Sequence, residues 1–390
     1  MPIIIKNNKF DNIVDKLIYY FYFAFQFFFV FSGTAFMRSN DKIYKVAQAL
    51  IIIPFLLLAL CDFYYFLRGR FGKKEIIIYL LLGIVLALSF YNYRNVMVLA
   101  NLVVISTFKE TNGKKALKYY IYATIIAFVI ALLLGIFTPF KGDIVQARAG
   151  GVERTRYGLG FFYASLGQFY FLSIILAYIL IKEKIRLIES LIFIIISSIM
   201  FYFTDTKAPF VYSVFVIILF LIVDKLKNTK FFDLFSYLSI LSPFIACIGM
   251  YLMSLFYNEN IKVLEVINNI VSGRLALTHN AIMRFGVKLF GQTAPEVLGD
   301  SNYYLDSSLM VLLILFGLAV TVLSLCFMSY FAYLSYKNKK LIILVVIFFI
   351  SLRGAFDLGF MAIQFSPVVI LFMPMLKEYI ISRTTIEINQ

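Results

Sequence analysis

Side chains capable of chemistry are concentrated in one polar stretch of an otherwise apolar chain. This stretch, residues 258–306, contains the only histidine, His279, and several cations. A reaction in which a substrate hydroxyl attacks would need a general base to remove its proton, and either His279 or the carboxylate of Asp306 is available for this. The cations could bind the oxygens of a phosphate-bearing ligand. The candidate catalytic residues are Asp306, His279 and Arg274, and the candidate substrate-binding residues of this stretch are Arg284 and Lys288.

A second set of cations lies in shorter connections. The connection 139–156 carries three arginines around Gly150 and Gly151, whose missing side chains let a backbone approach a ligand closely. The planar guanidinium fork suits phosphate oxygens, although a solvated loop would have the same composition. The further binding candidates are Arg148, Arg154 and Arg156 here, Lys207 in the tight turn 204–210, and Arg353, which we favour as a structural i, i+4 partner of Asp357 that could also close the floor of a site.

Metal and thiol chemistry find little support in the sequence. The outer connections offer only scattered carboxylates and no DxD at a span end. The three cysteines, Cys61, Cys247 and Cys326, lie in apolar runs without CxxC spacing, so neither a zinc site nor a disulfide framework is indicated. We therefore expect a reaction without metal or other cofactor.

Composition sets the fold class. The chain is 62% hydrophobic and 15% charged, with many apolar runs of about 20 residues, the length that a helix needs to cross a bilayer. These runs are apolar on all sides, which excludes the alternation of a barrel strand. We predict an all-α polytopic membrane protein with one membrane domain, residues 1–390. The twelve predicted spans are 17–37, 46–67, 76–92, 95–108, 119–138, 158–181, 187–203, 208–223, 234–257, 305–334, 341–356 and 358–376.

The net charge of +15 follows an alternating pattern. Every second connection collects lysines and arginines, as positive-inside loops do, so nucleic acid need not be invoked as a partner. Both termini are then cytoplasmic, and 139–156 and 258–306 become outer loops. Within the latter, apolar spacing in 261–271 predicts a helix lying along the interface, and 274–290 is predicted to be helical as well. An amphipathic surface helix without chemistry is the alternative.

Four segments resemble a known family. They are RTRYGLGFFYASLGQFYFLSIILAY, FTDTKAPFVYSVFVIIL, SGRLALTHNAIMRFGVKLFGQ and YYLDSSLMVLLILFGLAV, which cover about residues 140–335. Together they are similar to the bacterial Wzy-type polysaccharide polymerases of the O-antigen polymerase/ligase superfamily, especially those of capsule and exopolysaccharide systems. The most specific part is SGRL, followed by LDSS and a span containing FG.

The resemblance implies a glycosyltransferase on the outer face of the bacterial cytoplasmic membrane. Such an enzyme moves a growing glycan from undecaprenyl diphosphate onto a lipid-linked repeat unit, with membrane lipid around it and chain-length regulator and flippase proteins as partners. Four positions match residues of the family's motifs. They are Arg156 before the Gly-Phe stretch, Lys207 in the turn, Arg274 in the Gly-Arg motif and Asp306 before the tenth span. Many relatives carry His-Pro-Asn where Tyr163-Ala164-Ser165 stands and His-Asn where Asn302-Tyr303 stands, so the relatives' histidine base does not carry over to His279.

Two alternatives remain open. A ligase of the same superfamily would move finished glycan to another acceptor, and sequence separates it poorly from a polymerase. A lipid-linked oligosaccharide flippase or other transporter could also have twelve spans. Transporters hold ionisable groups near the bilayer midplane, whereas the span centres here are nearly free of charge. This favours surface chemistry.

Overall fold

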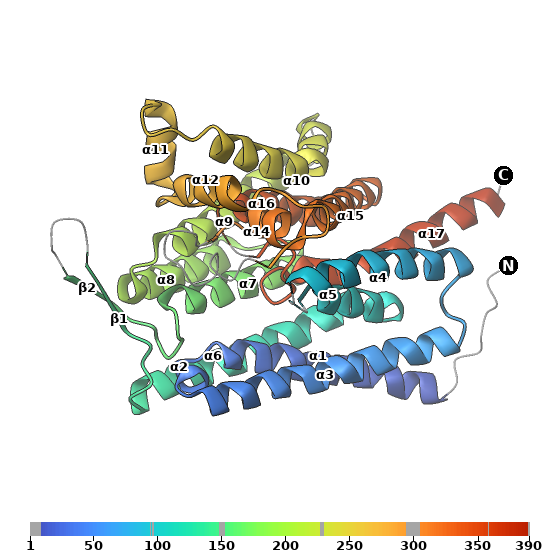
Figure 1. Cartoon of the computed structure of the whole chain (residues 1–390). Helices are drawn as coiled ribbons and strands as arrows, with labels where there is room; N and C mark the ends of the chain where they lie inside the picture. Colours follow the sequence, from blue (N-terminus) through green and yellow to red (C-terminus); the bar gives the residue numbers. More distant parts are fainter. Residues whose placement is uncertain are drawn as a thin grey trace. The chain divides into compact units, whose positions relative to one another are not determined.

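The computed structural model describes residues 9–93, 95, 97–147, 153–226, 230–293, 305–357 and 359–388. These residues form helices and one two-stranded antiparallel hairpin (Figure 1). The chain divides into two compact units. Unit 1 comprises residues 1–70, 103–221 and 367–390, and unit 2 comprises 71–102 and 222–366.

Unit 1 is built on helix-to-helix packing. Helix α1 packs against α3 and α6, α6 packs against α7, and α7 packs against α8. Of the helices long and apolar enough to span a membrane, α7 is the most enclosed. The hairpin leaves the end of α6 (Figure 1). The elements are α1 (Lys9–Ser32), α2 (Ala35–Arg38), α3 (Asp41–Leu67), η1 (Phe108–Glu110), α6 (Gly113–Phe137), β1 (Ile144–Ala147), β2 (Glu153–Arg156), α7 (Ala164–Lys182), α8 (Leu187–Thr204), most of α9 (Lys207–Leu226), η3 (Pro367–Leu371) and α17 (Phe372–Ile388).

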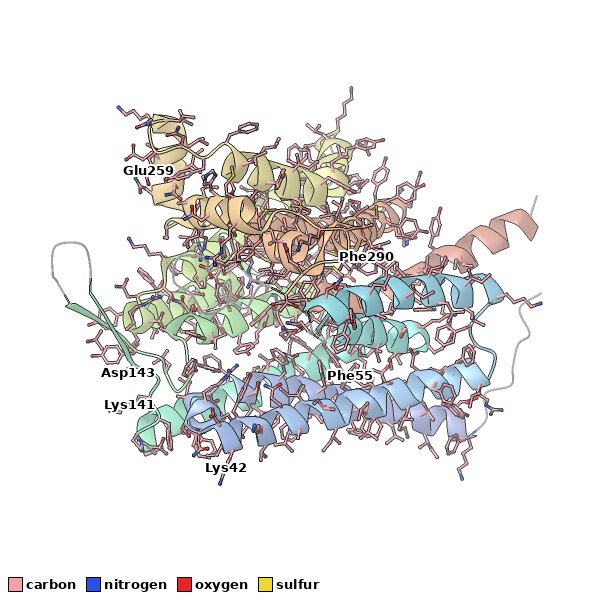
Figure 2. The ribbon with its side chains drawn as sticks, in the orientation of Figure 1. Lys42, Phe55, Lys141, Asp143, Glu259 and Phe290 are labelled. Atoms are coloured by element: carbon pink, nitrogen blue, oxygen red, sulfur yellow. The ribbon has the colours of Figure 1, made fainter. Side chains whose placement is uncertain are left out.

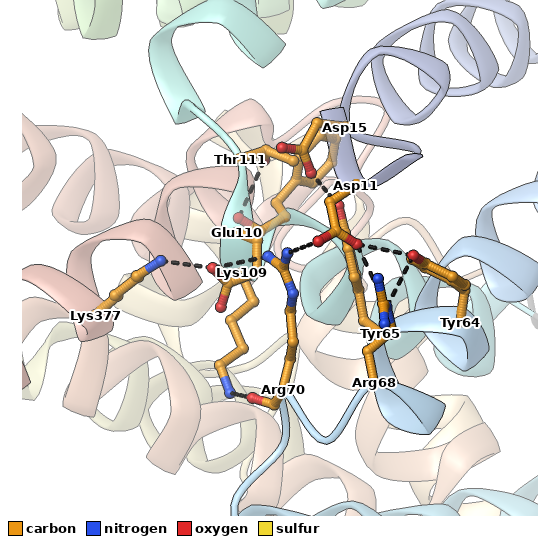
Figure 3. A network of polar contacts seen from close by, with 11 residues as sticks. Asp11, Asp15, Tyr64, Tyr65, Arg68, Arg70, Lys109, Glu110, Thr111 and Lys377 are labelled. Atoms are coloured by element: carbon orange, nitrogen blue, oxygen red, sulfur yellow. Dashed lines mark hydrogen bonds and ion pairs between the residues drawn. The ribbon is translucent and has the colours of Figure 1, made fainter. Parts of the chain in front are cut away.

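One end of unit 1 is tied by an ionic network (Figure 3). The buried carboxylate of Asp11 lies 3.0 Å from Arg70 and 3.6 Å from Arg68. Glu110 lies 3.5 Å from Arg70 and 2.6 Å from Lys377. The network joins the start of α1, the end of α3, η1 and α17. Basic residues that the alternating charge pattern assigns to one side of the membrane therefore meet at one end of the unit.

Unit 2 is organised around α10, which packs against α15 and α16 and also against α12. Helix α11 runs crosswise to α10 and α12 (Figure 1). The elements are α4 (Lys73–Tyr93), the start of α5 (Met97–Thr107), α10 (Phe231–Leu255), α11 (Lys262–Ile270), α12 (Arg274–Phe285), α14 (Ser308–Val311), η2 (Leu312–Phe316), α15 (Leu318–Lys337) and α16 (Leu341–Phe356).

Eight helices of the described chain are long and apolar enough to cross a membrane, which makes this a polytopic helical membrane protein. They are α1, α3, α4, α6, α7, α8, α10 and α15, and shorter apolar helices occur at Lys207–Val223 and Leu341–Phe356. Helix α5, in the predicted span 95–108, has only 11 residues, about 16 Å of helix. The structure thus supports fewer spans by length than the twelve predicted.

The predicted span 358–376 is not one helix. Residues 359–366 have no regular helix, η3 follows, and α17 begins only at Phe372. Pro367 lacks an N–H and disfavours helix at the residue before it. The Ser308 hydroxyl accepts the Phe360 N–H, and Asn101 donates to the Met361 carbonyl. Irregular backbone is tolerated at membrane depth when protein groups satisfy it in this way.

Candidate functional site

Arg274 stands at the first position of α12, immediately after a tight reversal of the chain. Helix α11 ends in a Schellman motif, in which the Gly273 N–H bonds the Asn268 carbonyl (2.8 Å) and the Ser272 N–H bonds the Asn269 carbonyl (3.2 Å). Ser272 (φ 58°) and Gly273 (φ 85°) are both left-handed. The Ser-Gly pair of the SGRL motif thus makes the turn that presents Arg274.

The side chain of Asn268 fixes the start of α12. Its Oδ1 accepts from the backbone N–H groups of Leu275 (3.1 Å) and Ala276 (3.2 Å), while its Nδ2 donates to the Tyr257 hydroxyl (3.0 Å). These N–H groups have no partner within the helix. Asn268 therefore positions Arg274 without touching it, and nothing in the sequence pattern singled it out.

The guanidinium of Arg274 contacts two carboxylates from distant parts of the chain. Its Nε lies 3.1 Å from Asp306 Oδ2, and its Nη2 lies 3.4 Å from Asp357 Oδ2. A cation at a helix N-terminus opposes the helix dipole, so these carboxylates compensate for an unfavourable position. The side chain of Asp357 is 3% exposed, whereas that of Asp306 is 26% exposed. Asp306 is therefore the carboxylate of the pair that a substrate could reach.

The LDSS motif joins Asp306 to the end of α16. The Ser307 hydroxyl accepts from the Met310 N–H and donates to the Gly354 carbonyl, both at 3.2 Å. The Ser308 hydroxyl donates to the Asp357 carbonyl (2.9 Å), which also accepts the Ser308 N–H. The two serines thus join the start of α14, next to Asp306, to the end of α16, next to Asp357.

Arg353 lies in the last turn of α16, four residues before Asp357, with 1% of its surface exposed. Its guanidinium packs against Gly359, where a side chain would begin 3.1 Å from Nη2. Gly359 has φ 115°, a conformation that glycine adopts most readily. That Arg353 closes the floor of a site stays a prediction. Asp357, its predicted i, i+4 partner, is also bound by Arg274.

The FG element marks a break in the predicted span 305–334. Helix α14 passes into the π-helical turn η2, and Gly317 (φ 96°) separates η2 from α15. A Cβ on Gly317 would overlap the Gly291 nitrogen and lie 2.7 Å from the Leu289 carbonyl. The Gln292 N–H bonds the Leu315 carbonyl, and Leu318 donates to the Lys288 carbonyl (2.9 Å). The loop carrying Lys288 is thereby fastened to the broken span.

The remaining candidates of this loop differ in their surroundings. The His279 Nδ1 lies 2.9 Å from the Ser254 carbonyl, and its ring meets Tyr257 edge-on. This contact ties α12 to the end of α10. Arg284 and Lys288 are exposed. The helix predicted in 261–271 is confirmed as α11, whereas the one predicted over 274–290 is confirmed only as far as Phe285, the last residue of α12. Gly286 ends it with φ 63°, so Lys288 lies in the loop that follows and does not continue the helix.

Other predicted binding residues belong to unit 1. Arg156 donates from Nε to the Thr204 carbonyl (3.1 Å), which fastens β2 to the end of α8. Lys207 is exposed at the start of α9. Arg148 lies outside the described residues, and of Arg154 only the backbone, in β2, is described. Within the described residues, no three His, Cys, Asp or Glu side chains are grouped as metal ligands would be.

Comparisons of this chain with protein-family models, with curated proteins and with solved structures find no significant match. In unit 2 the geometry of the site unites two segments of the most specific sequence motif, SGRL and LDSS, around one guanidinium.

Proposed function

We propose that this protein is a Wzy-type polysaccharide polymerase. It would join undecaprenyl-diphosphate-linked oligosaccharide units at the outer face of the bacterial cytoplasmic membrane. The observation that carries the proposal is the contact of Arg274 with Asp306 and Asp357. A partly exposed carboxylate held by a guanidinium in a helical membrane protein suits a reaction on a lipid head group.

Asp306 is the general base of the proposed reaction. Its carboxylate takes the proton of the acceptor hydroxyl while that oxygen bonds to the anomeric carbon of the donor sugar. The bond from this carbon to the diphosphate oxygen breaks, and the lipid diphosphate leaves with the electron pair. Arg274 orients Asp306 through the 3.1 Å contact. The exposed cations Arg284 and Lys288 stabilise the charge on the leaving group.

His279 is the alternative base. Its Nδ1 contact with the Ser254 carbonyl would fix one tautomer, in which Nε2 is the proton acceptor. The two bases are separable by substitution, because Asp306→Asn and His279→Gln each remove one and leave the other.

The decisive experiment uses purified protein and a defined undecaprenyl-diphosphate-linked repeat unit. We expect a ladder of polymer that persists in a chelator and is lost in Asp306→Asn. A Lys262→Ala variant changes an exposed cation of the same loop and should retain the ladder. Absence of polymer with wild-type protein that binds the substrate would overturn the proposal. Loss in chelator with recovery on adding a divalent cation would overturn the metal-free mechanism.

One observation favours a second candidate, a lipid-linked oligosaccharide transporter. Residues 359–366 form irregular backbone that includes the buried Phe360 and Ile363. Interrupted helices of this kind form substrate sites in transporters. A transporter would move the lipid-linked unit across vesicle membranes without forming glycosidic bonds, so the same substrate in sealed vesicles distinguishes the two.

A further inference from the structure

A cleft of about 610 Å³ lies in unit 1, at the end of α6 and α8. One part of its lining is apolar, from Leu132 and Ile136 of α6, Leu159, and Phe203 of α8. The other part carries two charges and two phenols, from Lys141, Asp143, Tyr157 and Tyr202. Figure 2 labels Lys141 and Asp143 on the segment between α6 and β1.

The cleft opens toward apolar surface. Ile136 is 67% exposed and Tyr202 is 81% exposed, and both belong to helices able to span a membrane. Lipid surrounds such a surface, so a ligand can enter from the bilayer with an apolar chain along α6 and α8. An amphiphile matches this division into apolar and polar walls.

The polar wall is rigid because glycines let neighbouring backbone segments come into direct contact. A Cβ on Gly142 would overlap the Phe161 carbonyl, and one on Gly160 would overlap the Ala131 carbonyl. The Gly160 N–H bonds the Lys141 carbonyl (2.9 Å), and the Gly158 N–H bonds Asp143 Oδ1 (3.1 Å). The backbone that carries both charged residues is thus preorganised.

The charges of the cleft define the head group. Lys141 and Asp143 are both exposed, and neither forms an ion pair with any residue of the described chain. Among the described residues that line the cleft, one cation and one carboxylate sum to zero, and the carboxylate would repel a phosphate or diphosphate. Both charged groups can bond hydroxyls, since the ammonium donates and the carboxylate accepts. The two tyrosines alone could belong to an aromatic belt at the membrane interface. Such a belt does not account for two charged side chains that form no ion pair with the described residues.

We propose that this cleft binds the uncharged, polyhydroxyl head of a membrane amphiphile, such as a sugar-bearing lipid. Lys141 and Asp143 bond its hydroxyls, the phenols of Tyr157 and Tyr202 flank the head, and the chain follows α6 and α8. The inference depends on unit 1 alone and does not rest on the glycosyl transfer proposed for unit 2.

The test uses the absence of tryptophan from the sequence. Tyr202→Trp places a single fluorophore in the cleft, and Tyr122→Trp places one on an exposed position of α6 that does not line it. Each protein, in nanodiscs, is titrated below micelle concentration with decyl glucoside, decyl galactoside, decyl maltoside and decyl phosphate. In the Tyr202→Trp protein we expect a saturable emission change with at least one glycoside, at a concentration at least tenfold lower than with decyl phosphate. The Tyr122→Trp protein should show no such change.

Asp143→Asn, introduced into the Tyr202→Trp protein, tests what the negative charge of Asp143 contributes to binding. The amide oxygen of asparagine can still accept the Gly158 N–H, so the fold of the segment is retained. We expect the glycoside concentration that gives half-saturation to rise at least tenfold. Lys141→Gln should raise it as well. No saturable change with any glycoside, equal responses of the two tryptophan variants, stronger binding of decyl phosphate, or no effect of Asp143→Asn would each overturn the proposal.

Discussion

Arg274 and Asp306 are separated by 32 residues, and their side chains meet at 3.1 Å. Two loop segments that the sequence alone placed in one stretch are thereby joined through a charge-assisted hydrogen bond. Asp357, from the end of α16, approaches the same guanidinium. The side chain of Asp306 is 26% exposed and that of Asp357 is 3% exposed, so only Asp306 is open to a ligand, as its proposed role as a base requires.

Substitution of Arg274 should separate charge from geometry. Arg274→Lys keeps the cation, but a single ammonium does not reproduce a planar fork that reaches two carboxylates. We expect polymer formation to fall by about 10²-fold or more, with lipid-linked single repeat units accumulating in cells. Arg274→Ala should also destabilise unit 2 by about 3 kcal/mol, because Asp357 loses a buried partner. Normal chain lengths in both variants would contradict the assignment.

Asn268 should affect activity only by fixing the start of α12. Asn268→Ala removes the acceptor of two helix N–H groups, which costs about 1 kcal/mol of stability and should reduce polymer formation by loosening Arg274. Asn268→Asp retains an acceptor oxygen and should recover most of both. Thermal unfolding and polymer length measured on the same preparations check this. Activity loss that aspartate does not rescue would give Asn268 a direct role.

Sequence patterns predicted helices better than the breaks within them. The span 341–356 has the same bounds as α16, because a continuous apolar run needs no distant partner to be helical. The break at Gly317 was not predicted, since it depends on the backbone of Gly291 in another segment. The apolar sequence of a span is the same whether its helix is continuous or broken by a contact with a distant segment.

The candidate site was predictable in residue types but not in pairings. Arg274 and Asp306 stand in motifs, whereas the role of Asp357 as a second partner of Arg274 is a long-range contact. The i, i+4 rule points to Arg353 as a partner of Asp357, which stays a prediction, and it cannot show the contact with Arg274 because it considers only one helix. Asn268 carries no signal beyond its type, since its role exists only once α11 and α12 meet.

Gly317 should tolerate no side chain. A Cβ there would collide with the Gly291 backbone, and φ 96° is strained for any other residue. We expect Gly317→Ala to cost about 3 kcal/mol or more and to lower expression of folded protein. The matched control is Gly249→Ala in α10, where nothing lies within 4 Å of the added Cβ. That change should stabilise by up to about 1 kcal/mol, and a similar loss in both variants would refute the role of the break.

The ionic network at the start of α1 should stabilise unit 1 (Figure 3). Asp11 is 1% exposed and is approached by Arg68 and Arg70, so Asp11→Asn removes the carboxylate between two guanidinium groups. We expect a loss of about 3 kcal/mol. The control pair, Lys114 and Glu183, is shorter than either Asp11 contact, at 2.5 Å, but its side chains are 53% and 45% exposed. Glu183→Gln should therefore cost less than about 1 kcal/mol. Denaturant-induced unfolding in detergent at low and high salt checks both, and equal losses would show that burial does not govern the strength of this network.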